Sequence, residues 1–348
     1  MENLKSDRPL LLAGGTENWA PWLEQVRNLA PVLGPNSTQL QKLRDLEFWQ
    51  DLARRVDGLS FPETAAKPGV AEPRAAKATV ARWLRKSISG SGGLGVQSAM
   101  TGEFDGSVSG NHYFQREVCG RVLGACLILP TAARECELVG VTESWAERDW
   151  PGPTEFIYRG SFGPVLLSEE QNRILLEVAE EVRRQTGLRG WLGVDFIEDA
   201  YGRLWLLELN PRWTAGMEIL ARAGRNPVPA HLACFAPDLI CQPSLQQIGG
   251  VDASSKLQTR VLAAKAVVYA ERELRLGERE IASLHKLPRR NFADIPRLPD
   301  GEKELIIEPG HPIMTVRCDT QKLTRPREKL LRRLSELYQR LGGKIQGC

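Results

Sequence analysis

The sequence has few of the residues that would mark a zinc site, a disulfide framework or a membrane segment. Its seven cysteines are scattered and include no Cys-x-x-Cys pair, and its four histidines show no metal-ligand spacing. This pattern indicates reduced thiols in a cytoplasmic protein. No apolar run reaches about 18 residues, so a transmembrane helix is not expected. The N-terminal residues 1–8 have mixed charge, which is unlike a signal peptide.

A strong charge of either sign is also missing. The net charge is +3 over 348 residues, which is too small to predict binding to nucleic acid or to an anionic membrane. Hydrophobic residues at 42% and charged residues at 26% are ordinary for a globular protein, and the length allows two or three domains. The dinucleotide-binding fingerprint and the P-loop pattern are both missing, which disfavours an oxidoreductase of the Rossmann type and a P-loop NTPase.

What is present begins with a hairpin near the middle of the chain, from Trp191 to Arg212. Two apolar runs flank a polar turn centred near Tyr201 and Gly202, which is typical of a β-hairpin. With that turn, Asp195 lies opposite Glu208, and Asn210 shares a face with Glu208 because alternate strand residues point the same way. Two carboxylates across a ladder repel each other unless a cation lies between them. Oxygen ligands of this kind favour Mg²⁺. The hairpin alone slightly favours solvated acids at a strand end.

A glycine cluster forms the second informative segment. It follows Lys86 and a predicted strand over residues 81–86, and its members are Gly90, Ser91, Gly92, Gly93 and Gly95. Glycines permit backbone conformations in which successive N–H groups line an anion site, and a preceding lysine can reach the same phosphates. By itself such a loop is more often a simple turn.

The third segment is a strand over residues 113–118. It carries Gln115, Glu117 and Val118 and ends at Gly120. A strand end of this kind can offer its backbone to the edge of a purine. Taken alone, a plain strand and turn is the better interpretation.

Helical patterns surround these segments. One helix is predicted over residues 38–56 with Ser37 as its cap, and a capping box at Ser168 begins another that runs to Arg184. Residues 61–76 are rich in Pro, Gly and Ala and indicate a linker.

The order of the three segments resembles the ATP-grasp superfamily. Lysine, glycine loop, Gln-x-Glu strand and then Asp with Glu-x-Asn-Pro-Arg follow one another between Pro31 and Leu341. The chain looks most like the carboxylate–amine ligases of the carbamoyl-phosphate-synthetase-like and biotin-carboxylase-like branch. Some of these make cofactors of one-carbon metabolism, including a tyramine–glutamate ligase. The resemblance implies an α/β (α+β) fold.

Three domains are implied. Residues 1–75 would form a short α/β domain that precedes the ATP-grasp fold. Residues 76–130 would form the small ATP-grasp subdomain, and residues 131–348 the large one with a C-terminal β/α extension. The first domain is short for this fold, which implies that it is trimmed or that the true start lies upstream.

The resemblance also implies roles for the residues, with ATP and Mg²⁺ as cofactors. Lys86 and the glycine loop would hold the ATP phosphates, and Gln115, Glu117 and Val118 would frame the adenine. Asp195, Glu208 and Asn210 would bind Mg²⁺, and Arg212 would face the acyl substrate or the transferring phosphoryl group. Relatives often carry Asp-Lys where this chain has Asp45-Leu46, and Lys42 and Arg44 are the substitutes nearby for the phosphate-contacting lysine.

The implied activity is ATP-dependent ligation. A small carboxylate would be phosphorylated to an acyl phosphate, and an amine would then displace phosphate to form an amide. The alternatives are a small-molecule kinase on the same fold and a nucleotide-binding regulatory or partner protein with weak catalysis. The partners expected are small molecules, with no nucleic acid and no membrane. A homodimer is compatible with the sequence, which does not give the oligomeric state.

One segment is a candidate for the substrate side. Residues 143–164 contain five aromatic residues and two arginines among prolines and glycines. They could line a pocket with an arginine for a carboxylate, and a loop held to the core by its aromatic rings is an equally good interpretation.

Overall fold

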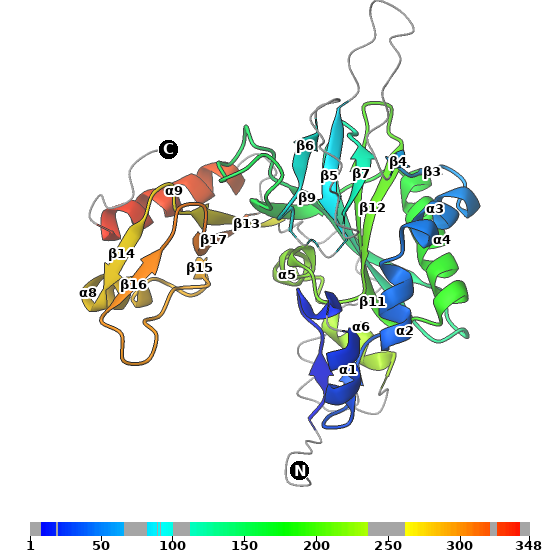
Figure 1. Cartoon of the computed structure of the whole chain (residues 1–348), viewed down its shortest axis with the longest axis horizontal. Coiled ribbons are helices and arrows are strands. Elements are labelled where there is room, and N and C mark those ends of the chain that lie inside the picture. The colour runs from blue at the N-terminus through cyan, green and yellow to red at the C-terminus, as the bar shows by residue number, and fades with distance from the viewer. Residues whose placement is uncertain are drawn as a thin grey trace, which may run out of the picture. The chain divides into compact units, whose positions relative to one another are not determined.

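The computed structural model describes residues 8–18, 20–65, 82–88, 90, 92–99, 112–235, 262–320 and 326–341. The chain forms two compact units (Figure 1). Unit 1 comprises residues 1–140, 166–217 and 227–250, and unit 2 comprises residues 141–165, 218–226 and 251–348. Helices and strands occur in both units, which confirms the predicted α/β class. No helix within the described ranges is long and apolar enough to cross a membrane.

Unit 1 begins with a small parallel pair of strands. β1 (Leu10–Leu11) pairs with β2 (Val32–Leu33), and the connection between them contains the short helix η2 (Thr16–Asn18) and α1 (Ala20–Arg27). Apolar residues of α1, β2 and the following helix form a buried cluster with Leu12, which comes directly after β1; the cluster consists of Leu12, Leu23, Val26, Val32 and Leu40. The two strands and the helix between them form a strand–helix–strand unit.

The next helical stretch is two helices, and the prediction of one helix over residues 38–56 was wrong. α2 (Ser37–Leu43) is capped by Asn36, whose side chain accepts from Gln39 N while Asn36 N donates to Gln39 Oε1. α3 (Leu46–Arg55) is capped by Asp45, whose carboxylate accepts from Glu47 N. Ser37 is thus the first helical residue and not the cap. The Asp45 cap ends the hydrogen-bond ladder between the helices, because a cap residue has extended backbone angles.

A four-stranded antiparallel sheet follows in unit 1. Its order is β4-β7-β5-β6, with β4 (Thr64–Ala65), β5 (Trp83–Ser87), β6 (Gln97–Ala99) and β7 (His112–Arg116). The glycine cluster connects β5 to β6. On β5 and β7, Lys86 pairs with Tyr113 and Leu84 with Gln115. Lys86 and Gln115 therefore lie diagonally across the ladder.

The larger sheet of unit 1 carries the predicted hairpin. Its order is β8-β11-β12-β3, with β3 (Leu59–Ser60), β8 (Arg121–Leu129), β11 (Gly190–Glu198) and β12 (Leu204–Asn210). α4 (Glu169–Thr186) lies beside α3 (Figure 1) and starts at the predicted Ser168 capping box. Gln171 of α4 donates to Glu198 Oε1 at 2.6 Å and to Gly202 O at 2.9 Å, which fastens the helix to the hairpin turn. α6 (Val228–Ala233) packs on β11.

Unit 2 has its own strands and apolar core. The strand order is β15-β17-β13-β10, with β10 (Gly160–Val165), β13 (Leu262–Tyr269), β15 (Phe292–Ala293) and β17 (Pro312–Thr320). β14 (Leu274–Gly277) pairs with β16 (Glu304–Ile307), and α8 (Glu278–His285) and α9 (Pro326–Arg340) complete the unit. β9 (Glu137–Ser144) and α5 (Ala215–Arg222) each contribute residues to both units.

The cysteines of the described residues are free thiols, as predicted. Four of them are buried and one is exposed; they are Cys126, Cys136, Cys234 and Cys318, with Cys119 at the surface. Burial raises the pKa of the Cys126 thiol well above its usual range, which keeps it protonated and unreactive. Cys241 and Cys348 lie outside the described residues.

Candidate functional site

The hairpin brings the three predicted oxygen ligands together in unit 1. Asp195 of β11 pairs directly with Glu208 of β12, and Gly193 pairs with Asn210. Asn210 Nδ2 donates to Asp195 Oδ2 at 2.9 Å. The register shifts immediately after the Asp195–Glu208 pair. Asp195 therefore lies opposite Glu208, as the sequence predicted.

Asn210 fits the donor set of a hard divalent cation. Its side chain is 2% exposed, and its Oδ1 atom has no hydrogen-bond partner in the structure. A buried carbonyl oxygen without a partner is costly unless a ligand satisfies it. Two carboxylates and an amide oxygen form the all-oxygen set that Mg²⁺ takes. Elsewhere and here, the described residues contain no group of three or more His, Cys, Asp or Glu side chains suited to a metal. The set at this hairpin has two carboxylates, and its third oxygen comes from an amide.

Both carboxylates are held at unfavourable positions for their charge. Burial raises the pKa of Asp195 to about 6. Burial, and then the charge of Asp195, raises the pKa of Glu208 to about 7, although Arg44, Arg212 and Lys86 oppose the rise. A cation bound between the two carboxylates would relieve the desolvation cost and the mutual repulsion together.

Lys86 lies beside the carboxylates at the end of β5. Its Nζ donates to Gln115 Oε1 at 2.9 Å and lies 5.9 Å from the centre of the Tyr113 ring. Burial lowers the pKa of Lys86, and the charges of Glu208 and Asp195 oppose that shift. Gln115 is 1% exposed, and its Nε2 atom has no partner in the structure. The diagonal placement of Lys86 and Gln115 therefore brings an ammonium and an unused amide N–H to one face.

Arg212 follows the hairpin and is 9% exposed. Its Nη1 donates to Trp213 O at 3.3 Å, and Trp213 N donates to Leu12 O at 2.9 Å. The turn after β1 consequently lies against Arg212: a Cβ added to Gly14 would be 3.8 Å from Nη1. The sequence prediction did not connect this Gly-Gly turn with the hairpin, because the two segments are far apart in the sequence and meet only through tertiary packing.

Arg44 is the nearer of the two cations considered as substitutes for the absent lysine. Its Nη1 lies 4.0 Å from Glu208 Oε1, and its Nη2 donates to Ile88 O at 2.5 Å. Lys42 points elsewhere, since its Nζ donates to Gln185 O at 2.9 Å. Tyr113 was not predicted as a site residue. Its pKa is raised, first by burial and then by the charge of Glu208.

The glycine cluster forms the turn of the β5–β6 hairpin. Gly92, Gly93 and Gly95 have φ values of 61°, 80° and 78°, which residues with a Cβ rarely adopt. Around Gly92 and Gly95 an added Cβ would meet nothing within 4 Å. The backbone is therefore open at Gly92 and Gly95, whereas a Cβ added at Gly90 would lie 3.2 Å from Ser87 O. Ser91 lies outside the described residues.

Glu117 and Val118 come directly after β7. Glu117 N donates to Arg82 O at 2.9 Å, and its carboxylate lies 3.4 Å from Arg82 Nε. Both residues are partly buried. Their predicted contact with adenine stays a prediction.

The aromatic segment of residues 143–164 is held to the core of unit 2 by its rings. The indole N–H groups of Trp145 and Trp150 donate to Lys265 O and Val267 O, each at 2.8 Å. Arg159 is 3% exposed and donates to backbone carbonyls of its own loop, including Thr154 O at 2.6 Å. These three side chains are therefore committed to holding the loop. Tyr158 stays partly buried, with its hydroxyl 2.8 Å from Ser161 Oγ.

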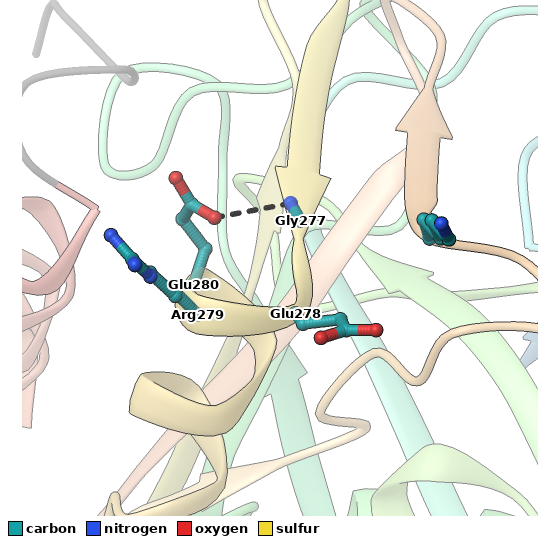
Figure 2. Close-up of a pocket in the computed structure, with 5 residues that line it drawn as sticks. Gly277, Glu278, Arg279 and Glu280 are labelled. Atoms are coloured by element: carbon teal, nitrogen blue, oxygen red, sulfur yellow. Dashed lines mark hydrogen bonds between the residues drawn. The ribbon is translucent and has the colours of Figure 1, made fainter.

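A surface pocket in unit 2 contains none of these residues (Figure 2). Gly277, Glu278, Arg279, Glu280 and Lys303 line it. The Glu280 carboxylate accepts from Gly277 N at 3.1 Å (Figure 2), so the start of α8 is already occupied by its own side chain. Nothing in its lining connects this pocket with the oxygen ligands of unit 1.

Comparison with known proteins gives one family match. The sequence profile of a family described as an ATP-grasp domain matches residues 52–216, a range that includes Lys86, the glycine loop and the hairpin. Curated proteins give no match to this sequence.

Solved structures are similar in fold at low sequence identity. N5-carboxyaminoimidazole ribonucleotide synthetase from Thermotoga maritima is 14% identical with a TM-score of 0.54, covering 90% of this chain and 76% of that one. L-amino acid ligase from Bacillus licheniformis is 12% identical with a TM-score of 0.57, covering 93% and 82%. The biotin carboxylase domain of Hydrogenobacter thermophilus 2-oxoglutarate carboxylase, in complex with MgADP, ADP and bicarbonate, is 13% identical with a TM-score of 0.57, covering 93% and 71%.

Proposed function

Because the chain belongs to the ATP-grasp superfamily, we propose that it is an ATP- and Mg²⁺-dependent ligase. It joins a small carboxylate to an amine through an acyl phosphate. The observation that carries this proposal is the shared face of Asp195, Glu208 and Asn210 with the cations Lys86 and Arg212 beside it. Two of the proteins that resemble the chain in fold are a synthetase and a ligase of small molecules, which supports the same class of reaction.

The nucleotide would lie against the small sheet of unit 1. Lys86 neutralises the phosphates, and the open backbone of the glycine turn donates N–H groups to them; the turn residues are Gly90, Ser91, Gly92, Gly93 and Gly95. Gln115, Glu117 and Val118 frame the adenine at the end of β7.

The hairpin would hold the metal. Asp195 and Glu208 contribute carboxylate oxygens, and Asn210 contributes the Oδ1 atom that has no protein partner. When bound, Mg²⁺ supplies neutralisation of the phosphate charge. The chain's own task is then to keep these three side chains on one face, which the β11–β12 register does.

The reaction has two displacements. A carboxylate oxygen of the substrate attacks the γ-phosphorus, the bond to the β–γ bridging oxygen breaks, and ADP leaves. The nitrogen of the amine then attacks the acyl carbon, the bond from that carbon to the phosphate oxygen breaks, and the nitrogen loses a proton. Anionic carboxylate and triphosphate repel each other, so positioning and charge neutralisation by Lys86 and Arg212 are the main catalytic contributions. The glycine loop covers the phosphates and excludes water that would hydrolyse the acyl phosphate.

An isotope experiment tests this chemistry directly. A panel of carboxylates and amines is screened for ADP release, and the active carboxylate is then labelled with ¹⁸O in both oxygens. The mechanism requires that one ¹⁸O atom appears in the inorganic phosphate for each amide formed, which mass spectrometry measures.

The two alternatives give different results in the same experiment. A kinase releases ADP without any amine and leaves a stable phosphorylated product. A regulatory nucleotide-binding protein binds ATP and shows no turnover over the whole panel. Amide formation without transfer of ¹⁸O to phosphate would exclude the acyl phosphate.

A further inference from the structure

We propose that unit 2 holds a binding site for a substrate carboxylate, formed by Lys265 and Arg317 beside Glu218. The group bound there is a carboxylate that does not react, so one substrate of the proposed ligase carries a carboxylate in addition to its reacting group. Its identification as a substrate group rests on the proposed function, whereas carboxylate binding itself is measured without any reaction. All three residues belong to unit 2.

Three polar side chains form a row across neighbouring strands of unit 2. Lys265 of β13 lies directly opposite Ser161 of β10 and directly opposite Arg317 of β17. Directly paired residues point to the same face of a sheet, so these three side chains share one face. Ala264 and Ala266, on either side of Lys265, point to the other face and belong to the buried apolar core of unit 2. The row Ser161–Lys265–Arg317 therefore lies on the face opposite that core.

Two cations directly across a ladder repel each other, so Lys265 and Arg317 need an anion between them. Glu218 of α5 supplies one charge: it accepts from Lys265 Nζ at 2.6 Å and from Arg317 Nη1 at 3.1 Å. Burial would raise the pKa of Glu218, but the charges and hydrogen bonds of the two cations hold it below its usual value. Arg222 and Asp319 form a separate pair at 2.9 Å. Glu218 is therefore ionised, and it compensates one of the two positive charges.

Hydrogen-bond donors of the row are left without acceptors. Within the described ranges, Glu218 is the one acceptor bonded to the Lys265 ammonium, which has three N–H groups. The Lys265 side chain is only 11% exposed. Arg317 Nε is buried and has no partner in the described part of the chain. Buried donors without an acceptor are costly. A carboxylate from outside the chain satisfies them and supplies the missing negative charge.

The surroundings of the row fit a small monoanion. The Tyr158 ring lies 5.9 Å from Lys265 Nζ, and its hydroxyl lies 2.8 Å from Ser161 Oγ. The Glu218 and Arg317 side chains are 29% and 18% exposed, so a ligand can reach the row beside them. A monovalent carboxylate balances the single excess charge, whereas a phosphate dianion exceeds it. Cations that bond a carboxylate occupy its lone pairs, so the bound group is not the nucleophile of the reaction.

The site also revises the prediction for the substrate side of the chain. The sequence suggested that residues 143–164 line a pocket with an arginine for a carboxylate. Arg159 of that segment instead donates to carbonyls of its own loop. The segment contributes Tyr158 and Ser161, and the cations beside them come from β13 and β17.

Calorimetry on the full chain without ATP tests the site. The probes are succinate and L-alanine, each compared with the corresponding amide, succinamide or L-alaninamide, and inorganic phosphate. We expect the two acids to bind, the two amides not to bind, and phosphate to bind less tightly than the acids. Failure of both acids to bind, or tighter binding of phosphate than of either acid, overturns the carboxylate assignment.

Two substitutions should change the affinity for the acids in opposite directions. Lys265→Met leaves Arg317 balanced by Glu218, so the chain should fold and should bind the acids about tenfold or more weakly. Glu218→Gln removes the competing carboxylate and should tighten binding several-fold. Lys286→Met, which removes the same charge at the exposed end of α8, is the matched control and should bind as the wild-type protein does. Thermal unfolding checks that each variant is folded.

A purely structural role predicts a different pattern, because it would weaken binding in both variants. Unchanged affinity in Lys265→Met, or weaker binding in Glu218→Gln, therefore overturns the site. In the ligation screen, Lys265→Met should raise the KM of the substrate that carries the additional carboxylate while kcat changes little. Whether the KM of the acid or that of the amine rises identifies this substrate.

The proposed ligase activity is tested separately from the site. Carboxylate binding that depends on Lys265, together with no ligation over the panel, supports the site and contradicts the ligase. Ligation with unchanged KM values in Lys265→Met supports the ligase and overturns the site.

Discussion

The two ends of the Asn210 side-chain amide have different surroundings in the hairpin: Nδ2 contacts a carboxylate, and Oδ1 is buried. The Glu-Leu-Asn spacing was enough to predict that Glu208 and Asn210 share a face. The sequence could not show that Nδ2 of Asn210 bonds Asp195 while Oδ1 is buried without a partner. That division depends on the register between two strands and on burial, both of which are tertiary properties.

Removing one charge at Glu208 should separate metal-dependent from metal-independent binding. We expect Glu208→Gln to weaken ATP binding in the presence of Mg²⁺ by tenfold or more, because a charged oxygen ligand becomes a neutral one. Calorimetry with and without Mg²⁺ measures this. Glu198→Gln on the same hairpin is the control: its carboxylate bonds Arg121 and Gln171, and its ATP affinity should be unchanged. Equal ATP affinities of Glu208→Gln and the wild-type protein in the presence of Mg²⁺ would contradict the metal site.

His231 should make the folded state sensitive to acid. Its Nδ1 accepts from Trp191 N at 3.0 Å, its Nε2 donates to Leu33 O at 3.1 Å, and its ring stacks on Trp191. Burial lowers the pKa of His231 to about 4. The folded pKa lies below the unfolded value of about 6.5, so the stabilisation is fully present above pH 6.5 and is lost as the pH falls toward 4. Its upper size is about 3 kcal/mol.

Denaturant unfolding at several pH values between 7.5 and 4 checks this. As the pH falls, the free energy of unfolding should decrease more steeply for the wild-type protein than for His231→Gln, which has no titrating ring at this position. Parallel curves for the two proteins would show that His231 does not titrate in this range.

At the scale of elements, the hairpin and the helix ends decided what could be predicted. The β11–β12 hairpin and α4 were predicted because their alternation, turn and capping box are local signals. The break at Arg44 was missed because Leu40, Leu43, Phe48 and Leu52 are all buried and continue an apolar pattern across it. Two side-chain caps, Asn36 and Asp45, override that pattern, and a cap is recognised with certainty only from its bonds.

The lack of a side chain at Gly193 should be required by the hairpin. A Cβ there would be 2.7 Å from Thr214 Cγ2 and 3.3 Å from Asn210 Cβ. We expect Gly193→Ala to push Asn210 out of its position, to lower the unfolding free energy by about 1–3 kcal/mol and to weaken Mg²⁺-dependent ATP binding several-fold. Gly34→Ala is the control, because its Cβ would meet Leu12 Cδ1 at an ordinary 3.4 Å. Unchanged ATP binding in Gly193→Ala would show that Asn210 tolerates displacement.

At the scale of the whole molecule, each unit brings together segments that are separated in the sequence. Unit 2 is assembled from three such segments, and several of its elements, including β10, β14 and α8, were not predicted. β10 has the sequence Gly-Ser-Phe-Gly-Pro-Val, whose glycines and proline argue against a strand in isolation. Its pairing with β13 fixes it: at Gly160, φ is 116° and a Cβ would be 2.3 Å from Lys265 O. The division into domains 1–75, 76–130 and 131–348 stays a prediction.

Every residue proposed to bind nucleotide belongs to unit 1. We expect ATP to stabilise the folded chain fully only as a complex with Mg²⁺. At a free ligand concentration of 100 times Kd, binding adds about 2.7 kcal/mol to the stability of the folded state. For a unit of this size, that raises the unfolding midpoint by roughly 5–10 °C. Scanning calorimetry of the full chain with ATP, with Mg²⁺, and with both measures the effect. The midpoint should rise fully only with both ligands, because ATP alone leaves Asp195 and Glu208 facing the phosphates without a cation between them.

Glu208→Gln should reduce the rise with both ligands, whereas Lys42→Met should keep it. An equal rise with ATP alone would mean that the cations Lys86, Arg44 and Arg212 suffice to hold the nucleotide and that the carboxylate pair has another role.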